Sequence, residues 1–225
     1  MYEKQGYFIV LDGMDSSSKT TQVQELKQYF ESVGKKVITT REPGGTSAAN
    51  LVRKMLIEKD RENWDGVSEL LLFSAARRNH VENLIKPALR DGYIVLCDRF
   101  VPSTIAYQGY GHGIPIDMIK KTTEIAIGDF QPDLTVLFLM DPKLCLLRAT
   151  KRGGTDSHYE DIGSSFHDRV YNGFENIYLD NLMECDIDSP SYRPIGHIHI
   201  DEENTINEVT AMLLEEIKKF LPELL

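Results

Sequence analysis

The sequence has little of what marks a secreted protein, a membrane protein or a zinc protein. Its three cysteines, Cys97, Cys145 and Cys185, follow neither a disulfide framework nor the spacing of zinc ligands. The first residues lack a signal-peptide pattern, and no apolar run approaches the ~20 residues that a membrane-spanning helix needs. We therefore expect a cytoplasmic protein with no membrane partner.

Basic charge is also scarce. The 225 residues include 25 Lys and Arg against 35 Asp and Glu, which gives a formal net charge of -10 and a pI of about 5.1. This balance argues against nonspecific electrostatic binding of nucleic acids, so we expect no nucleic-acid partner. A local basic pocket in such a protein can still hold a small anion such as a nucleotide.

Short apolar runs alternate with helical patterns along the chain. Runs rich in Val, Ile, Leu and Phe predict strands at residues 7–11, 36–40, 93–97, 134–140 and 195–200. Helices are predicted at residues 20–33, 48–58, 67–90, 115–128, 143–151, 166–183 and 205–221. The alternation indicates an α/β fold, with a doubly wound, parallel, five-stranded sheet flanked by helices. No linker-like segment interrupts it, so we expect a single domain over residues 1–225.

The residues after the first predicted strand have the layout of a phosphate-binding loop. Residues 13–20 read Gly-Met-Asp-Ser-Ser-Ser-Lys-Thr, close to the pattern G-x-x-x-x-G-K-S/T. In such a loop, backbone N–H groups at a helix N-terminus hold phosphate oxygens. Lys19 would add a positive charge at the β- and γ-phosphates, and the Thr20 hydroxyl would bind Mg²⁺. Contacts with the phosphates of a nucleotide are expected from Gly13, Ser16, Ser17, Ser18, Lys19, Thr20 and Thr21.

Ser18 stands where the pattern has its second glycine. A glycine there permits backbone angles that cost another residue about 1 kcal/mol or more, and it lets phosphate approach closely. Serine is small, and its hydroxyl can bond to the loop or cap the following helix. We expect a working loop with weakened nucleotide affinity. The alternative is a serine-rich helix start that binds nothing.

Further charged side chains lie at the ends of the second and third predicted strands and on the helix predicted at residues 67–90. Residues 40–46 read Thr-Arg-Glu-Pro-Gly-Gly-Thr, and a turn would need the Pro-Gly-Gly but not the charged pair before it. Asp98 and Arg99 follow the third predicted strand, where a carboxylate can hold Mg²⁺ and a guanidinium can clamp phosphate. Phe73 and Arg77 share a helix face, where ring and guanidinium could grip a base.

Each of these residues also has a purely structural interpretation. Phe73 could belong to the core, because it follows three leucines, and Arg77 could belong to a solvated helix face. Asp98 and Arg99 could form a surface ion pair of little energetic value. Tyr107 is equally compatible with a structural role. The six histidines form no metal-ligand pattern.

Taken together and in this order, the motifs resemble the thymidylate kinase family, P-loop enzymes that phosphorylate dTMP with ATP. The resemblance covers nearly the whole chain and includes TREPGGT, LLFSAAR, DRF, STIAYQG, a basic segment and a Tyr-Glu pair at 159–160. It implies the P-loop kinase fold with a mobile lid at roughly residues 148–162. It also implies ATP and dTMP as substrates, Mg²⁺ as cofactor and a homodimer.

The resemblance implies a role for each matching residue at the acceptor site. Asp15 would contact the 3′-hydroxyl of the sugar, Phe73 would stack on thymine, and Arg77 would hydrogen-bond the base. Arg99 would bind the dTMP phosphate. The remaining acceptor contacts are expected from Arg41, Glu42, Ser103, Tyr107, Gln108 and Tyr159. Tyr159 would also help exclude ribonucleotides.

The basic segment that precedes Gly153 and Gly154 is expected to act as the lid. Basic residues at a helix C-terminus are an ordinary match to the helix dipole, so a structural interpretation exists. The phosphate loop contains no arginine, so the charge on the transferred phosphoryl group would be neutralised from the lid. Arg152, with Arg148 or Lys151, is the candidate for this charge. Asp15, Lys19 and Arg99 complete the expected catalytic set, and Arg148 is also expected to contact ATP.

Two other functions remain open on the residues alone. One is a related deoxynucleoside or deoxynucleotide kinase, against which TREPGGT and the Tyr-Gln-Gly block argue. The other is a nucleotide-binding protein with impaired catalysis, and Ser18 is the only residue that suggests it. Contacts with adenine are signalled weakly, and the loop at residues 201–205 is the candidate for them.

Overall fold

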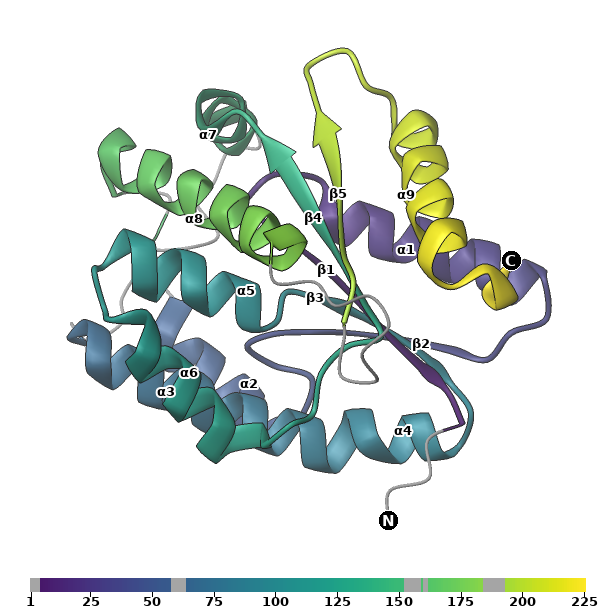
Figure 1. Cartoon of the computed structure of the whole chain (residues 1–225), viewed down its shortest axis with the longest axis horizontal. Helices are drawn as coiled ribbons and strands as arrows, with labels where there is room; N and C mark the ends of the chain where they lie inside the picture. Colours follow the sequence, from purple (N-terminus) through teal and green to yellow (C-terminus); the bar gives the residue numbers. More distant parts are fainter. Residues whose placement is uncertain (1–4, 58–63, 152–158, 160–161, 184–192) are drawn as a thin grey trace.

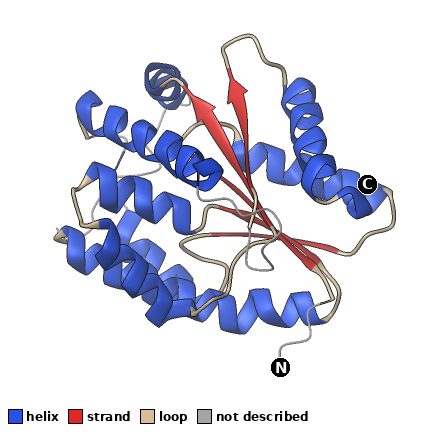
Figure 2. Ribbon diagram, in the orientation of Figure 1, coloured by secondary structure: helices blue, strands red, loops and turns tan. Residues whose placement is uncertain are grey.

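A twisted parallel sheet between two layers of helices forms the fold (Figure 1 and Figure 2). The computed structural model describes residues 5–57, 64–151, 159, 162–183 and 193–225. Five strands pair in the order β2-β3-β1-β4-β5, and every pairing is parallel. They are β1 (Tyr7–Gly13), β2 (Val37–Arg41), β3 (Ile94–Asp98), β4 (Leu134–Met140) and β5 (Ile195–Ile200). The predicted fold class is confirmed.

Helices cover both faces of this sheet, with α1 and α9 on one side and α4, α5 and α8 on the other (Figure 1). The α-helices are α1 (Lys19–Ser32), α2 (Ser47–Ile57), α3 (Gly66–His80), α4 (Lys86–Arg90), α5 (Val101–Thr104), α6 (Ile116–Ile127), α7 (Pro142–Lys151), α8 (Ser164–Met183) and α9 (Ile206–Phe220). Two π-helical segments, η1 (Val81–Ile85) and η2 (Ile105–Gly111), and one 3₁₀ turn, η4 (Pro222–Leu224), complete the described elements. None of the helices within the described residues has the length and hydropathy of a membrane span.

The position of β1 in the centre of the sheet explains why its sequence is a continuous apolar run. Phe8 and Val10 pack in one core cluster, with side chains of η1, α4 and α6. Ile9 and Leu11 point to the opposite face and pack in a second cluster, with side chains of α1 and α9. All four side chains are completely buried. Both faces are covered, as in other parallel sheets, so the strand shows no alternation of polar and apolar residues.

The helix predicted at residues 67–90 forms as α3, η1 and α4 in direct succession, with a wider π turn in the middle. Pro87 gives a physical reason for that turn. Proline has no N–H to donate, and in a regular α-helix its ring clashes with the carbonyl four residues earlier. Opening the turn just before Pro87 removes the clash while the chain keeps its direction.

The sequence analysis did not predict the helical segment formed by α5 and η2. Pro102, Gly109 and Gly111 lower its helix propensity, so no helical pattern stands out. Tertiary packing decides the conformation instead, because a Cβ at Gly111 would approach the Phe166 ring to 2.6 Å and one at Gly109 would approach Ile116 to 2.7 Å. The glycines let α6 and α8 lie close against this segment.

The strand register sets the position of the site. Leu11 of β1 pairs with Asp98 of β3, and Asp98 also pairs with Arg41 of β2. The carboxyl ends of three neighbouring strands therefore lie side by side, and the segments that leave them carry the candidate residues. This is the edge where parallel α/β sheets bind ligands.

Candidate active site

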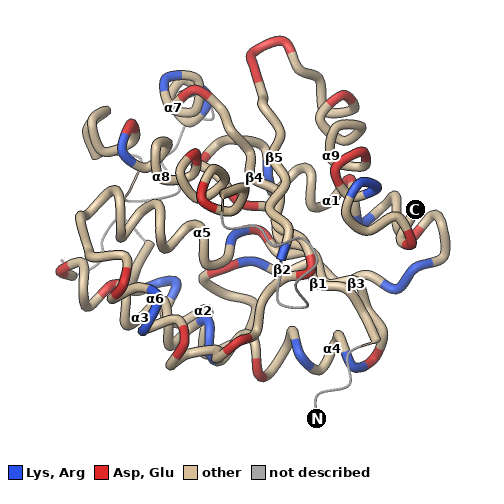
Figure 3. Tube along the Cα trace, viewed as in Figure 1, with Lys and Arg blue, Asp and Glu red and all other residues tan. Residues whose placement is uncertain are grey.

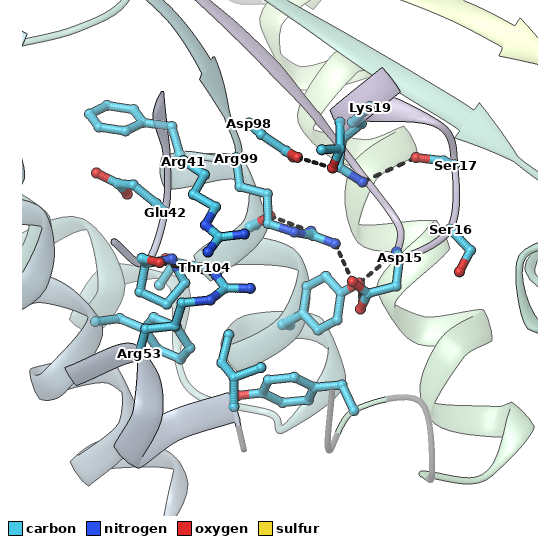
Figure 4. A pocket seen from close by; sticks show the side chains of 18 of the residues that line it. Asp15, Ser16, Ser17, Lys19, Arg41, Glu42, Arg53, Asp98, Arg99 and Thr104 are labelled. Atoms are coloured by element: carbon cyan, nitrogen blue, oxygen red, sulfur yellow. Dashed lines mark hydrogen bonds and ion pairs between the residues drawn. The ribbon is translucent and has the colours of Figure 1, made fainter. Parts of the chain in front are cut away.

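A cavity of about 530 Å³ opens at the carboxyl ends of β1, β2 and β3 (Figure 4). This volume suits a small-molecule ligand. Although the chain carries a net charge of -10, six basic side chains line the cavity against three acidic ones. The basic residues are Lys19, Arg41, Arg53, Arg77, Arg99 and Arg148. The cavity is therefore locally basic in a chain whose acidic residues are distributed over many elements (Figure 3).

The loop between β1 and α1 has the strained backbone that a phosphate-binding turn requires. The φ angle is +144° at Gly13, +61° at Ser16 and +72° at Ser18. A Cβ at Gly13 would lie 2.6 Å from the Phe138 carbonyl oxygen, so this position needs glycine. Ser18 adopts the left-handed conformation expected of the missing second glycine, at a cost of roughly 1–2 kcal/mol. The loop geometry is therefore kept with serine in place of glycine.

The Ser18 hydroxyl does not cap α1, although the residue directly precedes that helix. It accepts a hydrogen bond of 3.2 Å from Arg148 Nη1 instead. The same guanidinium donates from Nη2 to the Asp201 carbonyl oxygen at 3.1 Å. Arg148 thus connects α7 with the phosphate loop and with the segment before α9.

Lys19 lies folded over the loop. Its Nζ donates to the Met14 carbonyl oxygen at 2.5 Å and to Ser17 Oγ at 3.1 Å. Burial, together with the positive charge of Arg99, lowers the pKa of Lys19 to about 8. A phosphate group in the loop would supply the opposite charge that favours the protonated amine.

Thr20 and Asp98 present adjacent oxygen atoms at the start of α1. Thr20 Oγ1 donates to Asp98 Oδ2 at 2.6 Å. The other carboxylate oxygen, Asp98 Oδ1, is buried and has no hydrogen-bond partner among the described residues. Hard oxygen ligands in this arrangement fit Mg²⁺, which proteins usually bind through one or two side chains plus substrate phosphates. In the part of the chain that the structure describes, no cluster of three or more His, Cys, Asp or Glu residues forms a different metal site.

Arg99 and Asp15 form the centre of the cavity (Figure 4). Arg99 Nη2 lies 2.7 Å from Asp15 Oδ1, and the Tyr107 hydroxyl donates to Asp15 Oδ2 at 2.9 Å. Burial alone would raise the pKa of Asp15, but the charges of Arg99 and Lys19 lower it below its usual value. The carboxylate is therefore ionised at neutral pH, and Arg99 is held in place as a fixed positive charge.

Asp12 anchors the segment that carries this arginine, and the sequence analysis did not single it out. Its carboxylate is completely buried and accepts hydrogen bonds from the backbone N–H groups of Gly13, Phe100 and Ser103 and from Ser103 Oγ. These bonds attach the segment after β3 to the end of β1, and Arg99 lies in that segment with φ +73°. The only sequence signal is an aspartate inside an otherwise apolar run.

Arg77 is buried, which makes the interpretation as a solvated helix face wrong. Its Nε donates to Glu42 Oε2 at 2.7 Å, and its Nη2 donates to the Thr104 hydroxyl at 2.9 Å and the Phe100 carbonyl at 3.1 Å. Arg77 Nη1 is buried without a hydrogen-bond partner among the described residues. Arg77 lines the cavity together with Phe73, so this group is a donor that a ligand oxygen would satisfy.

Glu42 lines the cavity, but its two oxygens are engaged inside the protein. Oε2 binds Arg77, and Oε1 lies 3.0 Å from His80 Nδ1. The opposite ring nitrogen of His80 lies 2.7 Å from Thr40 Oγ1. Burial would raise the pKa of Glu42, but Arg77 and His80 lower it. The charged pair of TREPGGT is therefore divided, with Arg41 at the cavity and Glu42 supporting Arg77.

A buried carboxylate also supports Tyr159 and Gln108. Gln108 Nε2 donates to the Tyr159 hydroxyl at 2.9 Å, and that hydroxyl donates to Glu69 Oε2 at 2.8 Å. Glu69 is 1% exposed and was not singled out from the sequence. Its position four residues before Phe73, on the same helix face, was the available signal.

The structure brings almost all predicted site residues to this one cavity. Gly13 stands just before the lining residues, and Arg152 lies outside the described residues. Arg53 of α2 is an additional lining residue that no sequence motif indicated. It donates to the Pro43 carbonyl oxygen at 3.0 Å, and burial together with Arg41 and Arg99 lowers its pKa to about 10.

A second cavity of about 240 Å³ adjoins the first. The two share Ser18 and Arg148 among their lining residues. The remaining lining residues are Gln22, Ile200, Asn204, Ile206 and Val209, which are largely apolar and include one member of the loop at 201–205. The second cavity therefore runs from the phosphate loop toward α9.

Comparison with known proteins agrees with this geometry. The family model for thymidylate kinase matches residues 11–190. A thymidylate kinase of Caldicellulosiruptor saccharolyticus is 36% identical over 220 residues, which are 98% of each chain. One of Syntrophotalea carbinolica is 42% identical over 176 residues, 76% of this chain and 82% of the relative. The crystal structure of thymidylate kinase from Ehrlichia chaffeensis superposes with a TM-score of 0.72 at 33% identity, covering 96% of this chain and 100% of that chain. The chain belongs to the thymidylate kinase family.

Proposed function

We propose that this protein transfers the γ-phosphoryl group of ATP to dTMP, giving ADP and dTDP. The observation that carries the proposal is one cavity in which a phosphate loop, a fixed arginine and the aromatic side chains of Phe73, Tyr107 and Tyr159 meet. A loop that only bound nucleotide would have no need of the second set of cationic and aromatic residues across from it. Family membership supports the same reaction.

The donor nucleotide would lie along the phosphate loop. Loop N–H groups, Lys19 and the start of α1 would hold its phosphates. Thr20 and Asp98 would hold Mg²⁺, which when bound neutralises charge on the β- and γ-phosphates. The adenine would occupy the second cavity beside the loop at 201–205, where Asn204 offers polar groups among apolar side chains.

The acceptor would lie across the cavity. Arg99 and Arg41 would bind the dTMP phosphate, Asp15 and Tyr107 would contact the sugar, and Phe73 would stack on the base. The Arg77 Nη1 donor, without a partner among the described residues, supports recognition of a base carbonyl. Thymine presents an oxygen at position 4 where cytosine presents an amino group, so a guanidinium favours thymine. Ser103, Gln108 and Tyr159 would complete the acceptor site.

Phosphoryl transfer requires alignment and charge neutralisation more than proton transfer. The acceptor is already a phosphate anion, so no strong general base is needed. Lys19 and Arg99 would hold the two phosphates in line. Arg152 would complete the charge neutralisation from a lid at residues 148–162, and closure of that lid would exclude water that otherwise hydrolyses ATP.

A homodimer and a cytoplasmic, single-domain protein complete the proposal. Large apolar side chains are exposed on α2, α3 and α6, and α3 packs against both of the other helices. These side chains are Leu51, Met55, Val67, Leu71, Met118 and Ile125. An exposed apolar surface of this kind favours association. Light scattering of the purified protein tests the dimer, and Leu71→Glu is expected to shift the population toward monomer.

The decisive experiment measures ADP release from ATP and Mg²⁺ with dTMP as acceptor. The matched acceptors are dUMP, dCMP, dGMP, AMP and thymidine. We expect selective turnover of dTMP, with dUMP second because it lacks only the methyl group. Preference for thymidine would indicate a deoxynucleoside kinase. ATP binding without turnover of any acceptor would indicate a nucleotide-binding protein with impaired catalysis.

A further inference from the structure

Ser18 and Arg148 meet at the junction of the two cavities. They are 130 residues apart in the sequence, and Arg148 Nη1 donates to Ser18 Oγ at 3.2 Å. Both residues line the large cavity and the small one. A nucleotide whose phosphates lie in the loop and whose base lies in the second cavity has to pass this pair.

Arg148 is held at this junction from two sides. Its second terminal nitrogen donates to the Asp201 carbonyl oxygen at 3.1 Å, so the guanidinium bridges the phosphate loop and the segment before α9. Both acceptors are neutral oxygens, and Arg148 makes no ion pair with a described residue. The positive charge therefore remains available to an anion.

Ser18 occupies a strained position and uses its side chain outside its own loop. Its φ of +72° is the conformation that favours glycine, and its hydroxyl makes no capping bond to α1. Glycine would relieve the strain but would remove the acceptor for Arg148. The presence of serine instead of glycine at position 18 thus causes both the backbone strain and the hydrogen bond to Arg148.

We propose that Ser18 is a positioning residue for the donor nucleotide: its hydroxyl fixes the Arg148 guanidinium where the polyphosphate leaves the loop toward the second cavity. The inference rests on the proposed function, since it takes ATP as the ligand of this loop. This role is the opposite of what the sequence motif predicted, namely that serine at position 18 weakens nucleotide affinity. Serine in place of glycine supports ATP affinity here rather than weakening it.

The test is a double-mutant cycle between Ser18→Ala and Arg148→Ala, read by calorimetric binding of ATP with Mg²⁺ in the absence of acceptor. Loss of a hydrogen bond to a charged donor is expected to weaken binding about 3- to 10-fold in Ser18→Ala. In the Arg148→Ala background, Ser18→Ala is expected to cause no further loss, because the partner is already absent. The KM for dTMP is expected to stay unchanged.

Ser18→Gly separates the hydrogen bond from the backbone strain. We expect its melting temperature to rise, because the left-handed angle suits glycine, while its ATP affinity falls as in Ser18→Ala. Ser16→Gly is the matched control: it relieves a φ of +61° in the same loop, and Ser16 Oγ has no partner among the described residues. The effect of Ser16→Gly on ATP affinity should be the same with and without Arg148.

Two results would overturn the proposal. One is ATP binding by Ser18→Gly or Ser18→Ala as tight as that of the unmodified protein. The other is an equal loss from Ser18→Ala in both backgrounds. Because calorimetry needs no turnover, a protein that binds ATP but phosphorylates no acceptor would contradict the proposed function and leave this test intact.

Discussion

The Arg77 guanidinium and the Glu42 carboxylate form an ion pair in the protein interior, with Arg77 Nε 2.7 Å from Glu42 Oε2 and the side chains 3% and 5% exposed. The pair connects β2 with α3 and fixes the direction of the remaining guanidinium nitrogen, Nη1. Removing one partner of such a pair leaves a buried charge uncompensated. The pair therefore bears on stability and on the geometry of the base site at once.

Replacing Glu42 by glutamine should change both the stability of the protein and the geometry of the base site. We expect Glu42→Gln to lower the free energy of unfolding by about 3 kcal/mol, because the buried Arg77 charge loses its counterion. The KM for dTMP should rise more than the KM for ATP, because Arg77 lies on the acceptor side. Urea unfolding and steady-state kinetics measure the two effects.

Glu82→Gln is the control for Glu42→Gln. Glu82 pairs with Arg78 and Lys86 on a helix surface and is 33% exposed. Exposed pairs at this spacing are worth less than about 1 kcal/mol, so the control should unfold nearly as the unmodified protein does. Equal stability of the Glu42 and Glu82 variants would show that the interior pair contributes no more than a surface pair.

The residues that the sequence predicted for the site lie together in one cavity, and those near strand ends were the easiest to single out. Asp98 and Arg99 stand at the end of one apolar run, Lys19 and Thr20 follow another after a short loop, and the parallel register brings those runs together. The position of each residue along the chain therefore determines its place in the cavity to within a few residues. The same reasoning applied to Arg41, which pairs in register with Asp98.

The residues that support the site were harder to predict. Asp12 and Glu69 are buried carboxylates whose long-range partners lie 39 to 91 residues away in the chain. Arg53 reaches the cavity because α2 packs against α3. The local sequence marks Asp12 and Glu69 only by their positions, and it does not identify their partners, because the contacts depend on which elements become neighbours in three dimensions. The helix formed by α5 and η2 was missed for the same reason.

Asp12→Ala should disconnect the segment after β3. The buried N–H groups of Phe100 and Ser103 would lose their acceptor, and each unsatisfied donor costs about 1–3 kcal/mol. We expect a fall in melting temperature together with a lower kcat, because Arg99 lies between the tethered residues. Unchanged kcat in a folded, less stable variant would show that Arg99 keeps its position without Asp12.

Arg99→Ala should abolish most of the activity while the chain still folds. Arg99 is the donor to Asp15, Ser103 and the Gly13 carbonyl, and it is the proposed ligand of the acceptor phosphate. Loss of a charge that stabilises the transferred phosphoryl group costs on the order of 100-fold or more in kcat. Circular dichroism and melting temperature provide the folding control. A near-normal turnover rate would exclude Arg99 from the site.

The pH dependence of ATP binding should report the state of Lys19. Burial and Arg99 lower its pKa to about 8, against the opposing influence of Asp98, Asp15 and Asp12. Bound phosphates favour the charged amine, so the pKa in the complex should be higher than in the free protein. Above pH 8 the free protein has lost this proton and must take it up on binding. The dissociation constant for ATP should therefore rise with pH, approaching about tenfold per pH unit.

Calorimetry between pH 7 and 9.5, in two buffers that differ in ionisation enthalpy, measures that proton directly. We expect net uptake of nearly one proton at pH 9 and almost none at pH 7. Lys19→Arg is the control, because a guanidinium keeps its charge over this range and should give a flat profile even if its affinity is lower. Absence of proton uptake at pH 9 in the unmodified protein would mean that Lys19 is charged before ATP binds. Burial beneath its contacts with Met14 and Ser17 would then lower the pKa of Lys19 less than we expect.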